Sequence, residues 1–156
     1  MKQSISVLTL LIVVFILPSC GKKKGCMDPY SVNYNSDAEE DDGSCTYAAG
    51  TGGSVTLVAF PQHHGAPIMG DSSHVDSAFV KFNTSNAPGI ISSNYDLVIA
   101  GEVGETHVHI PGLKRGKYFI YMSGYDSTDS VRVTGGIPFE ITATSGEIGL
   151  NVPVTE

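Results

Sequence analysis

Short apolar runs separated by turn residues most constrain the fold of this chain. From Ser54 onward, stretches rich in Val, Ile, Phe, Tyr and Thr alternate with Gly, Pro, Asn and Asp, a pattern typical of strands and turns. In the clearest run, four apolar residues occupy every second position: Ile148, Leu150, Val152 and Val154. This period of two predicts a strand with one buried face, and Pro153 suits an edge strand or the end of a strand.

Eight strands of this kind are expected. They cover residues 54–60, 77–83, 95–100, 106–110, 117–124, 130–133, 137–142 and 147–154. No helical period of useful length interrupts them. We therefore predict an all-β fold, an antiparallel β-sandwich.

Composition excludes several functional classes. The 156 residues include 9 Lys and Arg against 16 Asp and Glu, which gives a formal net charge of −7. Because neutralising phosphates requires clustered basic residues, no nucleic-acid partner is expected. The sequence contains no G-x-S-x-G nucleophile elbow, and a sandwich of this size offers no cleft for a catalytic triad. We expect no enzymatic activity.

The N-terminal residues are similar to a bacterial lipoprotein signal. Lys2 precedes an apolar run at 7–17, which is shorter than the ~20 residues that a membrane-spanning helix needs. The following Leu17-Pro18-Ser19-Cys20-Gly21 resembles the lipobox, although Pro18 departs from its commonest pattern. This resemblance implies a signal peptide at 1–19, cleavage before Cys20, and attachment of acyl chains such as palmitate. An ordinary signal peptide or an uncleaved anchor is the alternative.

The residues after Cys20 bear on location. Gly21 resembles the residue at that position in lipoproteins passed on to the outer membrane, so we expect a lipid-anchored protein of the cell envelope in that membrane. Residues 20–24 would form a lipidated tether. Its lysines either touch anionic head groups or remain solvated.

Cys26 and Cys45 bound a small acidic module at 25–47. With Cys20 assigned to lipid, these two cysteines remain in an oxidising compartment, and we expect them to pair. Residues 25–45 resemble a module of secreted and surface proteins from Bacteroidetes-type bacteria, with the approximate pattern G-C-x-D-P-x-A-x-N-Y-x-x-x-A-x-x-D-D-G-S-C. A loop this short cannot bury its own core, so the bridge would substitute for one and stabilise it by ~3 kcal/mol.

Calcium is a candidate ligand of this module. Side chains with oxygen atoms alternate along it as in a Ca²⁺ loop: Asn33, Asn35, Asp37, Glu39 and Asp41. However, the sixth position holds Ala38 instead of Gly, and the twelfth holds Ser44 instead of an acid. The alternative is a solvated acidic loop with Asx turns at Asn33 and Asp42.

A flexible linker is expected at 48–53, before the sandwich at 54–156. Residues 108–121 resemble the carboxypeptidase regulatory-like, or transthyretin-like, sandwich family through a strand, the pattern G-L-x-x-G-x-Y and a second strand. Residues 65–68 and 78–82 are similar to the opening of that family. The resemblance implies a non-catalytic accessory or binding domain, in which Gly116 permits a turn and Tyr118 faces the core.

Histidines are the one cluster that could carry chemistry. There are five of them: His63, His64, His74, His107 and His109. His107 and His109 lie two apart on an expected strand, and the better core candidates Val108 and Ile110 flank His109, so both imidazoles should face solvent. This pair can chelate Cu²⁺ or Zn²⁺, with His63 and His64 as further ligands if their turn folds over it. Surface histidines without a metal are the alternative.

Aromatic residues suggest one further candidate surface, for binding sugar. Tyr121 and Tyr125, with Tyr95, could stack on a sugar. However, both alternating sets of the strand at 117–124 are apolar, which indicates a central strand buried on both faces.

Two functions of different classes follow. The first is a lipid-anchored, non-catalytic envelope protein without a cofactor, whose sandwich does structural work or binds a protein or carbohydrate partner. The second is a periplasmic or surface protein that binds copper or zinc through its histidines.

Overall fold

A computed structural model describes residues 21–68 and 73–156. The expected signal peptide and Cys20 therefore lie outside the described residues. The elements in chain order are β1 (Lys24–Gly25), β2 (Glu40–Asp41), β3 (Thr51–His63), β4 (Ala66–Pro67), β5 (Ser77–Phe82), the 3-10 helix η1 (Ser92–Asn94), β6 (Leu97–Ala100), β7 (Val108–Leu113), β8 (Gly116–Asp126), β9 (Val131–Ile141) and β10 (Ser145–Pro153). In this part of the chain, no helix has the length and apolar character needed to cross a membrane.

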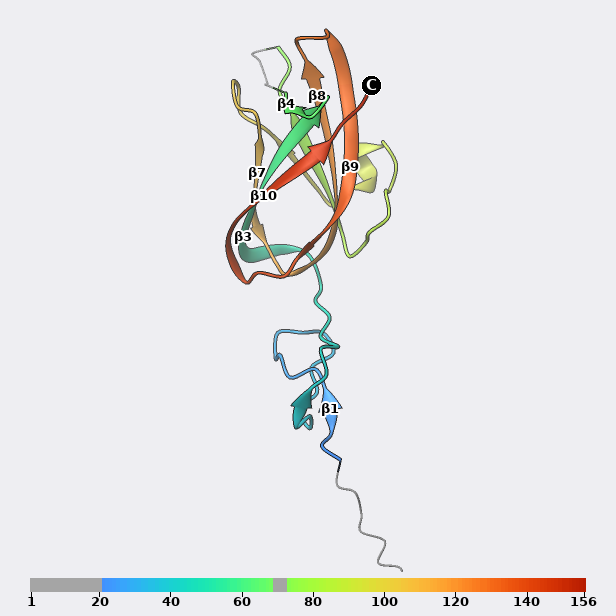
Figure 1. Cartoon of the computed structure of the whole chain (residues 1–156), viewed down its shortest axis with the longest axis vertical. Helices are drawn as coiled ribbons and strands as arrows, with labels where there is room; N and C mark the ends of the chain where they lie inside the picture. Colours follow the sequence, from blue (N-terminus) through green and yellow to red (C-terminus); the bar gives the residue numbers. More distant parts are fainter. Residues whose placement is uncertain (1–20, 69–72) are drawn as a thin grey trace, which may run out of the picture.

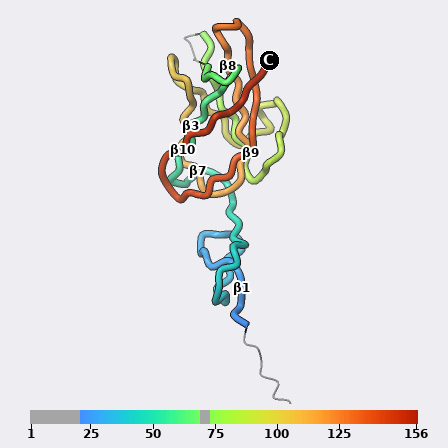
Figure 2. The backbone as a smooth tube through the Cα atoms, viewed as in Figure 1, coloured from blue at the N-terminus to red at the C-terminus, as the bar shows by residue number. Residues whose placement is uncertain are grey.

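Two four-stranded sheets form the larger body. In one sheet β3 pairs with β4, β7 and β10, and in the other the strand order is β6-β5-β8-β9. The predicted all-β sandwich is confirmed (Figure 1). The module and the sandwich lie end to end, and the backbone passes from one into the other at the start of β3 (Figure 2).

Within the two sheets of the sandwich, one pairing departs from the antiparallel pattern. β3 and β10 run parallel, with Ser54 opposite Ser145 and Gln62 opposite Pro153. The other pairings within the two sheets of the described chain are antiparallel. The alternation of residues 147–154 correctly indicated the buried face of β10. It could not indicate the direction of the neighbouring strand, because side chains alternate in the same way in parallel and antiparallel pairs.

The core lies between the two sheets and consists of alternate residues of their strands. The largest fully buried side chains are Val55, Leu57, Val80, Val108, Ile110, Leu113, Tyr118, Ile120, Met122, Val133, Ile141 and Val152. Burial of such side chains supplies the main driving force for folding. Tyr118 faces this core, as the sequence resemblance implied.

The strands expected at 130–133 and 137–142 are one continuous strand, β9. Gly135 and Gly136, which fall between the two expected strands, lie where neighbouring backbone comes close. A Cβ atom on Gly135 would be 2.1 Å from the Pro153 carbonyl oxygen, and one on Gly136 would be 2.7 Å from that of Ile120. These glycines therefore permit close strand packing and do not end the strand.

The segment at 48–53 also differs from its expected flexibility, because β3 already begins at Thr51. Ala49 is buried and donates its backbone N–H to Asn83 Oδ1 at 2.8 Å. A Cβ atom on Gly53 would lie 2.0 Å from the Leu113 carbonyl oxygen. The glycines that suggest a loose linker instead allow this segment to pack tightly against β7.

The Tyr118 side chain holds the segment at 48–53 against the sandwich through hydrogen bonds. Its hydroxyl donates to the Lys114 carbonyl oxygen at 2.6 Å and accepts the Gly50 backbone N–H at 3.1 Å. We expect Tyr118→Phe to lower the free energy of unfolding by about 2 kcal/mol, because two backbone groups lose this partner. Urea denaturation measures the change. Tyr121→Phe, on the partly exposed side of β8, is the control, and an equal loss in both variants would contradict the role of the Tyr118 hydroxyl.

Candidate functional site

The structure separates the four candidate metal-binding histidines into two pairs. His109 lies opposite Val58 in the pairing of β7 with β3. Directly paired residues share a face of a sheet and successive residues alternate, so His63 at the end of β3 faces the other side. The four-histidine site expected from the sequence is therefore not formed.

His107 and His109 face outward, as predicted, while Val108 and Ile110 are buried. Their Nε2 atoms are 3.0 Å apart, and His107 Nδ1 is 3.6 Å from Glu105 Oε2. The pair lines a pocket of about 160 Å³. This pocket is therefore lined by two neighbouring imidazoles.

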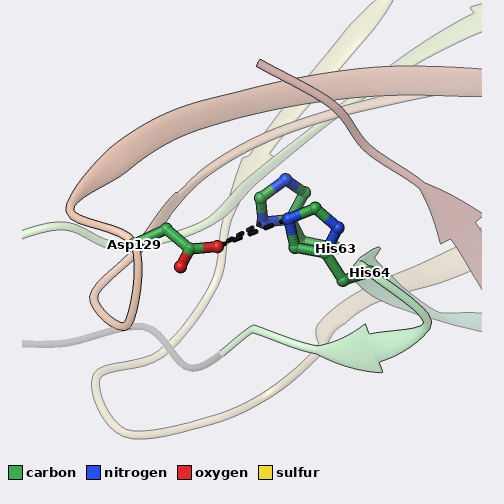
Figure 3. A group of neighbouring side chains, drawn as sticks. All are labelled: His63, His64 and Asp129. Atoms are coloured by element: carbon green, nitrogen blue, oxygen red, sulfur yellow. Dashed lines mark ion pairs between the residues drawn. The ribbon is translucent and has the colours of Figure 1, made fainter.

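His63 and His64 lie where β3 turns into β4. His63 is buried, and its Nδ1–H donates to Asp126 Oδ2 at 2.8 Å. His64 Nε2 is 3.4 Å from Asp129 Oδ2, and Figure 3 shows both imidazoles beside this carboxylate. The hydrogen bond from His63, followed by that from the Thr128 backbone, lowers the pKa of Asp126, so this carboxylate remains ionised near neutral pH.

The candidate calcium ligands are engaged in turns of the module. Asn35 Oδ1 accepts the Asp37 N–H at 3.0 Å, and Asp41 Oδ1 accepts the Gly43 N–H at 3.1 Å. Asp37 also lies 3.8 Å from Lys23 Nζ. These contacts belong to a solvated acidic loop, and calcium binding stays a prediction that calorimetry with Ca²⁺ would test.

The two expected Asx turns have different outcomes. Asp42 Oδ1 accepts the Ser44 N–H at 3.0 Å, as predicted. Asn33 instead spans the module, because its Oδ1 accepts the Thr46 N–H at 2.8 Å and its Nδ2 donates to the Ser44 carbonyl oxygen at 2.7 Å. Asn33 thus holds the two ends of the loop together next to the Cys26–Cys45 disulfide, whose predicted pairing is confirmed.

The three candidate sugar-stacking tyrosines do not form one exposed face. Tyr95 is 8% exposed and packs near Phe79 and Tyr121. Tyr125 stacks on His74 with ring centroids 4.0 Å apart. β8 lies between β5 and β9, so the predicted central position is confirmed, but only one face of the strand is fully buried and the other is partly exposed.

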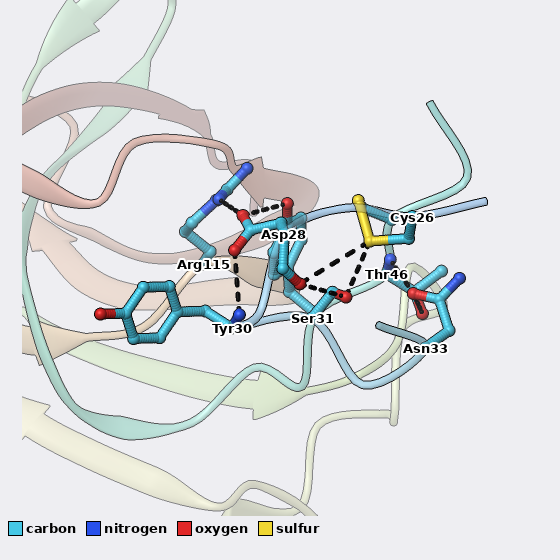
Figure 4. A network of polar contacts seen from close by, with 9 residues as sticks. Cys26, Asp28, Tyr30, Ser31, Asn33, Thr46 and Arg115 are labelled. Atoms are coloured by element: carbon cyan, nitrogen blue, oxygen red, sulfur yellow. Dashed lines mark hydrogen bonds and ion pairs between the residues drawn. A yellow bond between two sulfur atoms is a disulfide. The ribbon is translucent and has the colours of Figure 1, made fainter. Parts of the chain in front are cut away.

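Three side chains join the module to the sandwich. Arg115 Nη1, in the turn between β7 and β8, donates to Asp28 Oδ2 at 2.7 Å. The Tyr47 hydroxyl donates to the same oxygen at 2.8 Å, and the Arg115 guanidinium lies 3.7 Å from the centre of the Tyr47 ring. We call Asp28, Tyr47 and Arg115 the joint. Figure 4 shows Arg115 meeting Asp28 beside the disulfide.

Asp28 is held ionised at this joint. Hydrogen bonds from the Tyr30 backbone, the Tyr47 hydroxyl and Arg115 lower the pKa of its carboxyl group. Charge-assisted hydrogen bonds of this kind are short and directional. The joint therefore fixes the orientation of the module as well as its position.

A groove of about 770 Å³ runs beside the joint. The module contributes Tyr30, Val32 and Tyr47 to its lining, and the sandwich contributes Lys114 and Thr144. Pockets for small ligands have volumes on the order of 300 to 1,000 Å³. No local pattern in the sequence indicates this groove, because its two sides come from segments far apart in the chain.

The fold and the joint define a two-part all-β protein, in which a disulfide-bonded module is docked on a β-sandwich. No protein-family model matches the chain, and a search of curated proteins finds no match. Among solved structures it is similar to a DUF4876 family protein from Bacteroides thetaiotaomicron, with a TM-score of 0.37 and 19% identity over 65% of this chain. The match spans 24% of that protein. Likeness at this level carries no functional argument, so the family resemblances seen in the sequence stay predictions.

Proposed function

We propose that this chain is a non-catalytic protein of the bacterial cell envelope, attached to the outer membrane by lipid on Cys20. The observation that carries the proposal is the Cys26–Cys45 disulfide, because such bonds persist in oxidising compartments outside the cytoplasm. The apolar run at 7–17 and the lipobox-like residues before Gly21 support the same location.

The module would act as a rigid spacer between the lipid and the sandwich. Cys26 follows Cys20 closely in the sequence, so the module would sit next to the membrane surface. The joint then sets the direction in which the sandwich points, at the far end of the elongated molecule (Figure 1). A rigid spacer of this kind would present the sandwich at a fixed orientation to partners.

The groove beside the joint is the surface we assign to a protein or carbohydrate partner. Tyr30 is 87% exposed at its edge, and Val32 beside it is 67% exposed. Aromatic side chains with one apolar and one polar end are enriched where proteins bind partners. Structural or ligand-binding work of this kind needs no catalytic group.

Metabolic labelling with a palmitate analogue tests the anchor. We expect the full chain, expressed in a Gram-negative host, to carry the label and to enter the detergent phase on partitioning. Cys20→Ala should abolish both properties, whereas the control Cys26→Ala/Cys45→Ala should keep the label. Label retained in Cys20→Ala, or an unlabelled wild-type chain, would refute lipid attachment at this cysteine.

Arg115→Gln tests the joint. The change removes the ion pair with Asp28 and the stacking on Tyr47, so we expect amide hydrogen exchange in the module to accelerate about tenfold. Exchange in the strands of the sandwich should be unaffected. Lys117→Gln, which removes an exposed charge on β8, is the matched control. Equal exchange in the two variants would show that the joint does not hold the module.

A further inference from the structure

We propose that the end of the sandwich farthest from the module binds a divalent transition-metal cation of the zinc type. The ligands are His63, His64 and Asp129, and Asp126 lies beside them. This site is separate from the groove and does not depend on the lipid anchor. It also differs from the histidine cluster expected from the sequence, since it excludes His107 and His109 and includes two carboxylates.

Three segments bring these residues together. His63 is the last residue of β3 and His64 follows it in the turn to β4, while Asp129 lies in the turn between β8 and β9. One ligand atom from each of these three residues lies within 4.8 Å of the other two. Within residues 21–68 and 73–156, no other group of three or more His, Cys, Asp or Glu side chains meets this condition.

The distances suit tetrahedral coordination. Zinc bonds to imidazole nitrogen and carboxylate oxygen are about 2.0 to 2.2 Å long, which places neighbouring ligand atoms about 3.4 Å apart. Asp129 Oδ2 is 3.4 Å from His64 Nε2 and 3.7 Å from His63 Nδ1. A cation therefore fits between the three groups with small side-chain rotations (Figure 3).

Charge and burial favour a dication. The His63 side chain is 4% exposed and that of Asp126 is 13% exposed, so this part of the site is shielded from water. Two carboxylates face two imidazoles there, and a dication would balance their negative charge. Zn²⁺ would replace the proton that His63 Nδ1 donates to Asp126, and the Asp126 carboxylate would remain beside the cation as a second negative charge. A water molecule would complete the four ligands.

The turn itself holds His64 in a left-handed backbone conformation. His64 has a φ of 50° and Gly65 a φ of 80°, the positive values of the tight turns that connect β-hairpins. Asn is the residue most favoured before Gly in such a turn. Histidine at this position places an imidazole beside Asp129, where its Nε2 atom can bind the cation.

Calorimetric titration with ZnCl₂ tests the proposal. The full chain without a histidine tag is used in detergent solution, and we expect one Zn²⁺ per chain at micromolar free metal. Co²⁺ in place of Zn²⁺ should give the visible absorption of four-coordinate cobalt. Binding only at millimolar metal, or none, would overturn the proposal.

Variants locate the site. His64→Asn and Asp129→Asn change exposed side chains, and Asn accepts the backbone angle of His64. We expect each to weaken Zn²⁺ binding about tenfold or more, with unchanged circular dichroism. The matched control His107→Ala/His109→Ala should keep the wild-type affinity. Unchanged affinity in the first two variants, or a loss in the control alone, would refute the site. Palmitate labelling is unaffected by these changes, so failure here is distinguishable from failure of the anchor.

Discussion

Gly116→Ala is expected to lower the free energy of unfolding by about 4 kcal/mol, the largest effect that we predict for a single substitution. Gly116 begins β8 with a φ of 143°, a conformation essentially restricted to glycine. A Cβ atom there would lie 2.6 Å from the Ala49 backbone nitrogen and 2.7 Å from its Cα atom. Because these are backbone atoms, the clash could be relieved only by moving the segment before β3. Urea denaturation measures the loss.

Gly146→Ala serves as a control that distinguishes backbone strain from steric clash as causes of the lost stability. Gly146 also has a positive φ, of 103°, but nothing lies within 4 Å of the position that its Cβ atom would take. We expect this control to cost about 2 kcal/mol from backbone strain alone. If Gly116→Ala cost no more than Gly146→Ala, close packing of the segment at 48–53 against the turn would be refuted.

The second large effect concerns Asp76, a buried carboxylate in front of β5. Asp76 is 2% exposed, and neither of its oxygens has a hydrogen-bond partner in the described structure. Burial raises the pKa of its carboxyl group from 3.8 to about 6. The folded state therefore favours the neutral acid, and stability is lost as the pH rises from about 4 to about 6.

Asp76→Asn should remove this pH dependence. The free energy of unfolding of the variant minus that of the wild type is expected to rise by about 2 kcal/mol between pH 4 and pH 7. Taking this difference cancels the fixed cost of placing an amide there and the titration of other groups. Denaturation at several pH values provides the measurement, and a difference independent of pH would contradict the account.

Asp96→Asn is a control of opposite sign. The Phe82 backbone N–H and Lys81 lower the pKa of the Asp96 carboxyl group. The stability that this carboxylate contributes is present above its unfolded pKa and is lost as the pH falls through its folded pKa. The stability of Asp96→Asn relative to wild type should therefore rise toward low pH, opposite to the trend for Asp76→Asn.

Most strands could be located from the sequence because a half-buried strand repeats every two residues. Ile148 to Val154 showed the buried face of β10, and Val108 and Ile110 correctly implied that His107 and His109 face outward. The continuity of β9 through Gly135 could not be predicted, because the need for glycine there arises from the carbonyl oxygen of Pro153 in the last strand. The alternation of residues along a strand indicates which side chains are buried, whereas a close approach between two backbones depends on the neighbouring strand.

The candidate sites illustrate the same distinction. His63 and Asp126 are 63 residues apart, and Asp28 and Arg115 are 87 apart. No periodicity links such pairs, since each contact requires that two distant segments arrive at the same place. The histidines were recognisable as possible ligands, but their carboxylate partners were not.

The sequence by itself determined the all-β class and which residues of β7 and β10 are buried. Alternation and turn chemistry are local properties, so they can be inferred along the chain. Only the tertiary structure decided that β10 runs parallel to β3, that His63 and His64 meet Asp129 and not His107, and that Arg115 holds the module. These outcomes depend on how the two sheets pack and twist together, a balance of long-range contacts that no single segment encodes.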